Sequence, residues 1–212
     1  MSKKIVITGG LGYIGTELCK IYSGVSWNNT IIVIDNRFIS ERVNQIRNWN
    51  MEFVHGDILD KELIKKHCND ADVVHHLAGI TDVPRTKSES SEEKDNKIKA
   101  VAEEGTQNIL DAISDNCKII FPSTHVVYEG VEKVQNEISE NEEVKPILSY
   151  SNSKAANEKQ LKNSGKNYVI LRLGSVYGYS TDTARIDIMP NLFSKIASQN
   201  GTIKLFAGGR QV

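Results

Sequence analysis

Cysteine is scarce in this sequence of 212 residues, which holds three: Cys19, Cys68 and Cys117. They are widely spaced, odd in number and form no Cys-x-x-Cys pair. This excludes a small fold stapled by several disulfides. We expect reduced, mostly buried thiols in a cytoplasmic protein.

Long hydrophobic runs are also missing. The longest aliphatic run, Ile31 to Ile34, is far too short to cross a bilayer. The two lysines near the start are followed by an apolar stretch of only three residues, whereas a signal peptide needs roughly 7–15. We therefore expect neither a membrane segment nor a signal peptide.

Charge of one sign is not in excess. The 26 Lys and Arg residues nearly balance the 27 Asp and Glu residues, for a formal net charge of −1. A nucleic-acid-binding domain would normally show a basic excess, so that class is disfavoured. With 39% hydrophobic and 25% charged residues, the composition is typical of a soluble globular domain.

The sequence does contain a regular alternation of short aliphatic runs and helical stretches. We expect strands at residues 4–8, 30–35, 52–56, 72–77, 118–121 and 168–173, and helices at 11–23, 61–68, 93–114, 150–163 and 187–199. Continuous aliphatic runs suit strands that are buried on both faces of a parallel sheet. The alternation predicts a doubly wound, mostly parallel α/β fold of the Rossmann type.

Three glycines with the spacing Gly-x-x-Gly-x-x-Gly follow the first strand and open the first helix. Gly9 permits the tight turn, Gly12 lets the backbone approach a pyrophosphate, and Gly15 lets the helix pack close to the sheet. The N–H groups and the positive dipole at the start of the helix can hold phosphates. The pattern predicts a dinucleotide site.

Asp35 ends the second strand, 20 residues after Gly15. Its carboxylate can accept hydrogen bonds from the adenosine ribose and would repel a 2′-phosphate, which favours NAD over NADP. Arg37 favours NADP instead, because a nearby arginine can accommodate the 2′-phosphate.

Tyr150 and Lys154 are four residues apart at the start of an expected helix and therefore share one face. A free tyrosine has a pKa near 10 and is a poor base at neutral pH. Lys154 and the positive ring of an oxidised nicotinamide would favour the phenolate. Tyr150 is then a candidate acceptor for the proton of a substrate hydroxyl.

The end of the fifth strand supplies hydroxyl groups that could bind the substrate oxygen. Alternation after Phe121 favours Thr124 over Ser123 for this role. His75 and His76 are adjacent on a strand and point to opposite faces, so we do not expect them to share a metal ion.

Eight short segments follow one another along the chain: TGGLGYIG (8–15), DN (35–36), GDI (56–58), HLAG (76–79), GTQNIL (105–110), STHVVY (123–128), YSNSK (150–154) and LRLGSVYG (171–178). Together they resemble an extended short-chain dehydrogenase/reductase of the NAD-dependent sugar epimerase/dehydratase family. The match is specific for the family and much less so for a substrate.

The resemblance implies that NAD is the cofactor and that Thr124, Tyr150 and Lys154 form the catalytic set. It implies that Asp57 contacts the adenine amino group with Ile58 beside the ring, and that Lys154 also holds the nicotinamide ribose. The implied cofactor-binding residues are Gly9, Gly12, Tyr13, Ile14, Gly15, Asp35, Asn36, Asp57, Ile58, Leu77, Ala78, Gly79 and Lys154.

The resemblance also implies a nucleotide-activated sugar as substrate and a homodimer formed through the helices at 93–114 and 150–163. Our leading hypothesis is an epimerase that acts by transient oxidation to a keto intermediate. The alternatives are an NAD(P)-dependent reductase or dehydrogenase of a sugar or keto-sugar, and a non-catalytic NAD-binding module.

Four positions depart from the family pattern. His125 and Val126 replace the acid pair usual in dehydratases, and Val126 also replaces a glutamate usual in decarboxylases, which disfavours both reactions. Ala102 and Ser175 each stand where members of the family often have an asparagine. In those members the asparagine at the position of Ser175 touches substrate.

Residues 205–212 resemble the segment that precedes the family's C-terminal substrate-binding portion. We therefore expect an NAD-binding domain over residues 1–178 and the start of a substrate-binding portion over 179–212, with most of that portion absent. The sequence is compatible both with a naturally truncated chain and with a fragment of a longer one.

Overall fold

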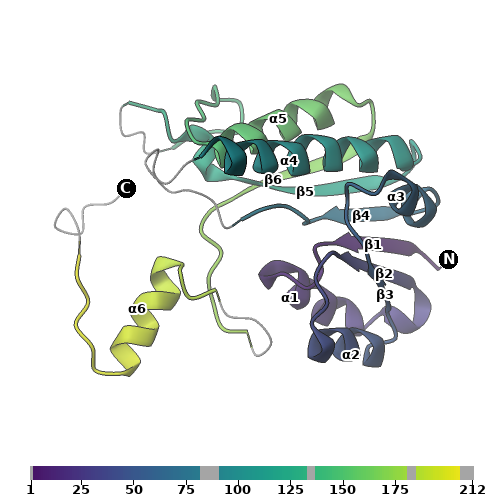
Figure 1. Cartoon of the computed structure of the whole chain (residues 1–212), viewed down its shortest axis with the longest axis horizontal. Helices are drawn as coiled ribbons and strands as arrows, with labels where there is room; N and C mark the ends of the chain where they lie inside the picture. The colour runs from purple at the N-terminus through teal and green to yellow at the C-terminus, as the bar shows by residue number, and fades with distance from the viewer. Residues whose placement is uncertain (1, 82–90, 133–136, 181–184, 206–212) are drawn as a thin grey trace.

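The computed structural model describes residues 2–81, 91–132, 137–180 and 185–205. Within them, six strands form one parallel sheet in the order β3-β2-β1-β4-β5-β6 (Figure 1). Their bounds are β1 (Lys4–Thr8), β2 (Thr30–Asp35), β3 (Glu52–His55), β4 (Val73–His76), β5 (Lys118–Thr124) and β6 (Asn167–Leu173). The predicted Rossmann-type fold is confirmed. The strand order reverses between β1 and β4, and ligands bind at the carboxyl ends of strands at such a point.

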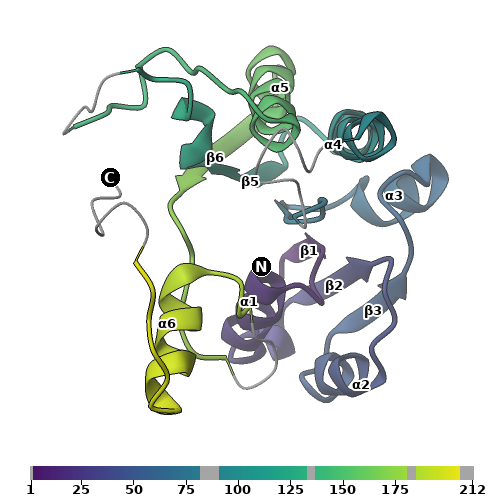
Figure 2. The ribbon, with the colours of Figure 1, turned by 60° about the vertical axis from the view of Figure 1, so that its left-hand side comes forward.

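Helices cover both faces of the sheet (Figures 1 and 2). One face carries α1 (Tyr13–Ser23) and α2 (Ser40–Asn48), while the other carries α3 (Lys61–Cys68), α4 (Glu92–Ala112) and α5 (Ser149–Asn163). In the described parts of the chain, the 3-10 turns η1 (Ser26–Asn28) and η3 (His125–Tyr128) lie in connections. No described helix has the length and apolarity needed to span a membrane.

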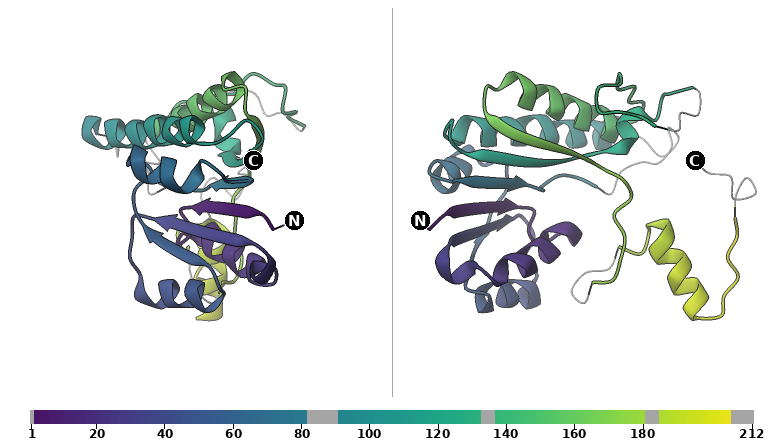
Figure 3. Two further views of the ribbon diagram at one scale, coloured as in Figure 1. Left: turned by 90° about the vertical axis from the view of Figure 1, so that its right-hand side faces the viewer. Right: turned by 180° about the vertical axis from the view of Figure 1, so that it is seen from behind.

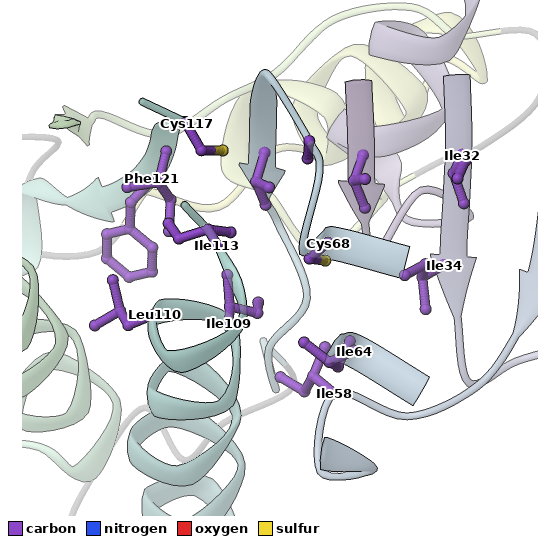
Figure 4. Close-up of a cluster of buried hydrophobic side chains, with 14 of the residues drawn as sticks. Ile32, Ile34, Ile58, Ile64, Cys68, Ile109, Leu110, Ile113, Cys117 and Phe121 are labelled. Atoms are coloured by element: carbon purple, nitrogen blue, oxygen red, sulfur yellow. The ribbon is translucent and has the colours of Figure 1, made fainter. Parts of the chain in front are cut away.

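The aliphatic strands are buried on both sides because successive side chains point to opposite faces. In β1, Val6 belongs to the core under α3, α4 and α5, whereas Ile5 and Ile7 belong to the core under α1 and α2. Figure 4 shows the first of these cores, where Cys68 and Cys117 lie among isoleucines. All three cysteines are free and buried, as expected.

Most of the expected elements are found with ends shifted by no more than two residues, and two elements differ by more. α2 was not expected, because only Val43 and Ile46 of its nine residues are buried and the rest are mostly polar. β5 extends three residues beyond its expected end and includes Pro122, because Pro122 to Thr124 pair in register with β6. This extension makes Ser123 and Thr124 part of the strand.

α6 (Met189–Ser198) stands apart from the sheet, beyond its carboxyl edge (Figure 3). None of its residues is buried. It is tied back to α1 through Tyr13, whose hydroxyl donates to the Gly178 carbonyl at 2.7 Å, and through Asn191, whose amide side chain accepts from the Gly178 N–H at 3.0 Å. The proposed boundary after residue 178 therefore lies in the extended segment between β6 and α6.

Candidate functional site

The glycine loop joins β1 to α1 at the strand-order reversal. Gly9 has φ +71°, in the left-handed region, and a Cβ there would lie 2.7 Å from the Ala78 nitrogen. A Cβ on Gly15 would lie 2.3 Å from the Gly9 carbonyl oxygen. Gly9 and Gly15 are therefore required by the turn and by the close packing of α1. Gly12 is the N-cap of α1 and makes no side-chain cap hydrogen bond, and a Cβ there would lie 3.1 Å from the Gly9 carbonyl oxygen. The N–H groups at such a helix start can bind an anion.

Replacing Gly15 with alanine should destabilise this loop. The new methyl group would collide with backbone atoms of Gly9 and Gly10, so we expect a loss of about 1–3 kcal/mol in the free energy of unfolding. Urea denaturation measures it. Gly24→Ala, at the other end of α1, is the control, since its Cβ would come no closer than 3.8 Å to the Ile21 carbonyl oxygen. Equal stability of the two variants would contradict the packing role of Gly15.

Asp35 is buried at the end of β2 and is held in place by backbone and side-chain donors. Its Oδ2 accepts from the Leu11 N–H at 2.9 Å, which ties the carboxylate to the glycine loop. Its Oδ1 accepts from the Arg37 N–H and from Arg37 Nε. The carboxylate thus lies where the sequence predicts, but it is already paired with the arginine.

Asp57 follows β3 and is oriented by its neighbours. Asn36 Nδ2 donates to Asp57 Oδ2 at 2.8 Å, and the Leu59 N–H donates to Oδ1 at 3.0 Å. Ile58 turns into the core, where it packs against α4 at Gly105. The structure brings Asn36 and Asp57 together, and their contacts with an adenine remain a prediction.

The segment after β4 lies directly beside the glycine loop. The Leu77 N–H donates to the Thr8 carbonyl at 3.1 Å, and the Ala78 N–H donates to the Thr8 hydroxyl at 3.2 Å. A Cβ on Gly79 would meet nothing within 4 Å, so this backbone can be approached closely. Two of the segments predicted to bind the cofactor are therefore adjacent.

A buried polar chain connects this loop to α5. His76 Nδ1 lies 3.0 Å from the Thr8 hydroxyl, and His76 Nε2 lies 3.0 Å from the Thr106 hydroxyl, which also accepts from Asn157 Nδ2. Burial, together with the charge of Lys154, lowers the pKa of His76 to about 3, so the imidazole is neutral. His75 instead bonds Tyr22 on the opposite face of the sheet, as the alternation of the strand requires.

Tyr150 and Lys154 share one face of α5, as the spacing predicts. Lys154 Nζ donates to the Pro122 carbonyl at 2.8 Å and lies 4.4 Å from the centre of the Phe121 ring and 5.9 Å from that of Tyr150. Burial lowers the pKa of Lys154 to about 8. The amine is therefore anchored on β5 rather than on the phenol oxygen.

The pKa of Tyr150 is not depressed in this structure. Burial raises it above its ordinary value, and the nearby charge of Arg185 opposes this only in part. The expected lowering by Lys154 is absent, because that amine faces the ring and β5. A positive group that arrives with the ligands, such as an oxidised nicotinamide ring, would lower it.

The hydroxyl groups at the end of β5 differ in their partners. Ser123 donates to Glu158 Oε1 at 2.6 Å and is thereby committed to α5. The Thr124 oxygen accepts from the Val126 N–H at 3.3 Å as the N-cap of η3, which leaves its own proton for another acceptor. This arrangement supports the choice of Thr124 over Ser123.

Sequence reasoning missed two acidic groups that position α5. Glu129 lies in a stretch rich in glutamate, a pattern typical of a solvated loop. Yet its Oε1 accepts from the Ile147 and Leu148 N–H groups, each at 2.7 Å, and from the Ser151 hydroxyl beside Tyr150. Glu158, one turn after Lys154, accepts from the Ser123 hydroxyl and from the Arg172 guanidinium. Only the distant partners distinguish these carboxylates from ordinary surface charges.

Residues 5–212 match the model of the NAD dependent epimerase/dehydratase family. The chain belongs to this family. The expected family is thus confirmed, and NAD is the family's cofactor.

Similar proteins include epimerases and a dehydratase. A putative UDP-glucose 4-epimerase of Methanocaldococcus jannaschii is 30% identical, with 98% of this chain and 67% of that protein covered. A dTDP-D-glucose 4,6-dehydratase of Dictyostelium discoideum is 30% identical, with 83% of this chain and 44% of that protein covered.

A solved structure of a tyrosine-to-phenylalanine variant of UDP-glucuronic acid 4-epimerase from Bacillus cereus, in complex with NAD and a fluorinated UDP-sugar, has a TM-score of 0.79 and 26% identity. The alignment covers 97% of this chain and 66% of that one. The chain therefore spans between less than half and about two thirds of the length of these relatives.

Proposed function

We propose that the chain binds NAD at the carboxyl edge between β1 and β4 and acts in the epimerisation of a nucleotide-activated sugar. The observation that carries the proposal is the placement of Tyr150 and Lys154 on one face of α5, with the Lys154 amine anchored to the end of β5. The polar chain from Thr8 to Asn157 joins this helix to the glycine loop. Family membership supports the same site.

The residues present fit a dinucleotide. Gly12 adds no side chain at the start of α1, the Asp35 carboxylate accepts from the Leu11 N–H of the loop, and Asn36 orients Asp57 after β3. A Cβ on Gly79 would meet nothing within 4 Å. The remaining proposed contacts are those of Tyr13, Ile14, Gly15, Asn36, Ile58, Leu77 and Ala78, with Lys154 on the nicotinamide ribose. When bound, NAD supplies the acceptor and later the donor of a hydride.

The side chains of α5 and β5 supply the proton chemistry. Tyr150 accepts the proton of the sugar hydroxyl as its carbon is oxidised, and returns the proton after the keto sugar has turned in the site. Thr124 donates a hydrogen bond to the reacting oxygen. A positive charge beside the buried phenol is needed to bring its raised pKa down. His125 and Val126 after Thr124 supply no acid pair, which favours epimerisation over dehydration.

Three further expectations belong to this proposal. Residues 1–178 hold the cofactor and residues 179–212 begin the substrate-binding portion. The homodimer forms through α4 and α5, between which lies an open groove of about 430 Å³. The cytoplasmic location is in keeping with three free, buried thiols.

Titration of NAD and NADP into the purified chain tests the cofactor assignment. We expect tighter binding of NAD, because the buried Asp35 carboxylate would repel a 2′-phosphate. Asp35→Ala should weaken the binding of NAD about tenfold or more, since it removes charged hydrogen-bond acceptors. It should also reduce the difference in affinity between NAD and NADP. Tighter binding of NADP to the wild type would contradict the assignment.

The reaction type is tested with UDP-glucose and UDP-glucuronic acid as probes. An epimerase converts the sugar with no net change in the nicotinamide absorbance band, and the product is detected by NMR. Net formation or consumption of NADH would instead indicate a dehydrogenase or reductase. Binding of NAD without turnover of any sugar nucleotide would indicate a binding module.

A further inference from the structure

The Asp35 carboxylate has no acceptor capacity to spare. Oδ1 accepts from the Arg37 N–H at 3.0 Å and from Nε at 3.1 Å, while Oδ2 accepts from the Leu11 N–H at 2.9 Å and from Arg37 Nη2 at 3.3 Å. An ionised carboxylate offers about four lone-pair sites. All four are used, and two of them are taken by the guanidinium.

Of the two partners, Arg37 is the one able to move. Its side chain is 53% exposed, whereas that of Asp35 is 4% exposed and pinned to the glycine loop. The guanidinium also overhangs that loop, because a Cβ on Gly12 would lie 3.8 Å from Arg37 Nη2. Arg37 therefore occupies the side of the carboxylate from which a ribose would approach.

We propose that Arg37 sets the cofactor selectivity of the site by competing with the cofactor's ribose for Asp35. The two hydroxyl groups of an NAD ribose must displace the guanidinium before they can donate to the carboxylate. The displaced guanidinium lies beside the ribose, where it pairs with a 2′-phosphate in two-pronged fashion when the cofactor is NADP. Arg37 thus weakens NAD binding and strengthens NADP binding. This inference rests on the proposed dinucleotide site.

Loss of Arg37 should change the affinities for NAD and NADP in opposite directions, so the effect can be distinguished from damage to the fold. A half-exposed ion pair contributes little, so Arg37→Leu should tighten NAD binding by about two- to fivefold. Loss of a charge-assisted pair with the phosphate should weaken NADP binding by about tenfold. A variant that is merely less well folded would lose affinity for both cofactors.

Isothermal titration of NAD and NADP into wild type, Arg37→Leu and Arg37→Lys measures both constants. Arg47→Leu on α2 is the matched control, since it removes the same charge from an exposed position and should leave the affinity ratio unchanged. Arg37→Lys should retain part of the affinity for NADP through its charge, but it should lose the two-pronged contact that a guanidinium makes with the phosphate.

Changes of the same sign for both cofactors, or an unchanged ratio in Arg37→Leu, would overturn the inference alone. A wild-type chain that binds neither cofactor would overturn the proposed function and this inference with it.

Discussion

Replacement of Tyr150 with phenylalanine is expected to reduce turnover of a nucleotide sugar by at least roughly 10²–10⁴-fold, the range typical for loss of a positioned acid–base group. The ring of Tyr150 packs near Lys154, whose amine lies 5.9 Å from the ring centre, and phenylalanine preserves that contact. Folding and NAD affinity should therefore survive the change, while the only ionisable group at that point is removed.

Turnover is compared at equal cofactor saturation, with UDP-glucose or UDP-glucuronic acid as the probe. Tyr168→Phe is the matched control, because Tyr168 is exposed in β6 and belongs to no proposed site. Because burial raises the pKa of Tyr150, wild-type turnover should rise with pH as the phenol ionises, and the variant should lack this rise. Unchanged turnover in Tyr150→Phe would falsify the catalytic assignment.

Glu158→Ala should lower the free energy of unfolding at neutral pH by about 3–5 kcal/mol, as expected when one partner of a buried ion pair is removed. Glu158 is 3% exposed and accepts from Arg172 Nε at 2.9 Å, from Arg172 Nη2 at 2.6 Å and from the Ser123 hydroxyl at 2.6 Å. The variant leaves Arg172, itself 12% exposed, without its carboxylate. It also releases α5 from the ends of β5 and β6.

The loss should depend on pH in a defined direction. Burial raises the pKa of Glu158, but the hydrogen bonds from Arg172 and Ser123 and the neighbouring charges outweigh it, and the pKa lies below its ordinary 4.5. A carboxyl whose pKa is lowered by folding stabilises the fold fully above its unfolded pKa, and this contribution is lost as the pH falls through the folded value. Urea denaturation from neutral to acid pH should show the wild type and the variant converging below about pH 4.5.

Glu104→Ala is the control for this series, because Glu104 is exposed on α4, where substitutions usually change stability by no more than about 0.5 kcal/mol. A gap between wild type and Glu158→Ala that stays constant into acid would show that the carboxylate acts by shape alone. The ionic account would then be wrong.

The six strands and the glycine turn could be predicted from the sequence because their signals are local. A strand buried on both faces needs an unbroken aliphatic run, and Ile31 to Ile34 is one wherever it pairs. The turn after β1 needs left-handed backbone at Gly9, where φ is +71°. α2 escaped prediction because its buried face consists of two residues, too few for a helical period to stand out.

The candidate site likewise has features that the local sequence determines and features that depend on tertiary contacts. The spacing of Tyr150 and Lys154 determines that they share a helical face, whatever surrounds the helix. What each side chain contacts was decided by which strand ends meet. Lys154 reaches the Pro122 carbonyl, 32 residues away, and Glu158 meets Ser123 across 35 residues. No periodicity in a sequence records such pairs, because they depend on the packing of α5 across β5 and β6.

The tertiary structure also decided the state of the groups that the sequence had named. Asp35 was predictable as a carboxylate at a strand end, but its capture by Arg37 depends on a side chain folding back over the glycine loop. Tyr150 was predictable as a phenol near a cation, but its pKa is raised because burial removes water and the nearest amine faces elsewhere. Burial and hydrogen-bond direction are properties of the packed chain, so sequence alone could name these groups without giving their charge state or their partners.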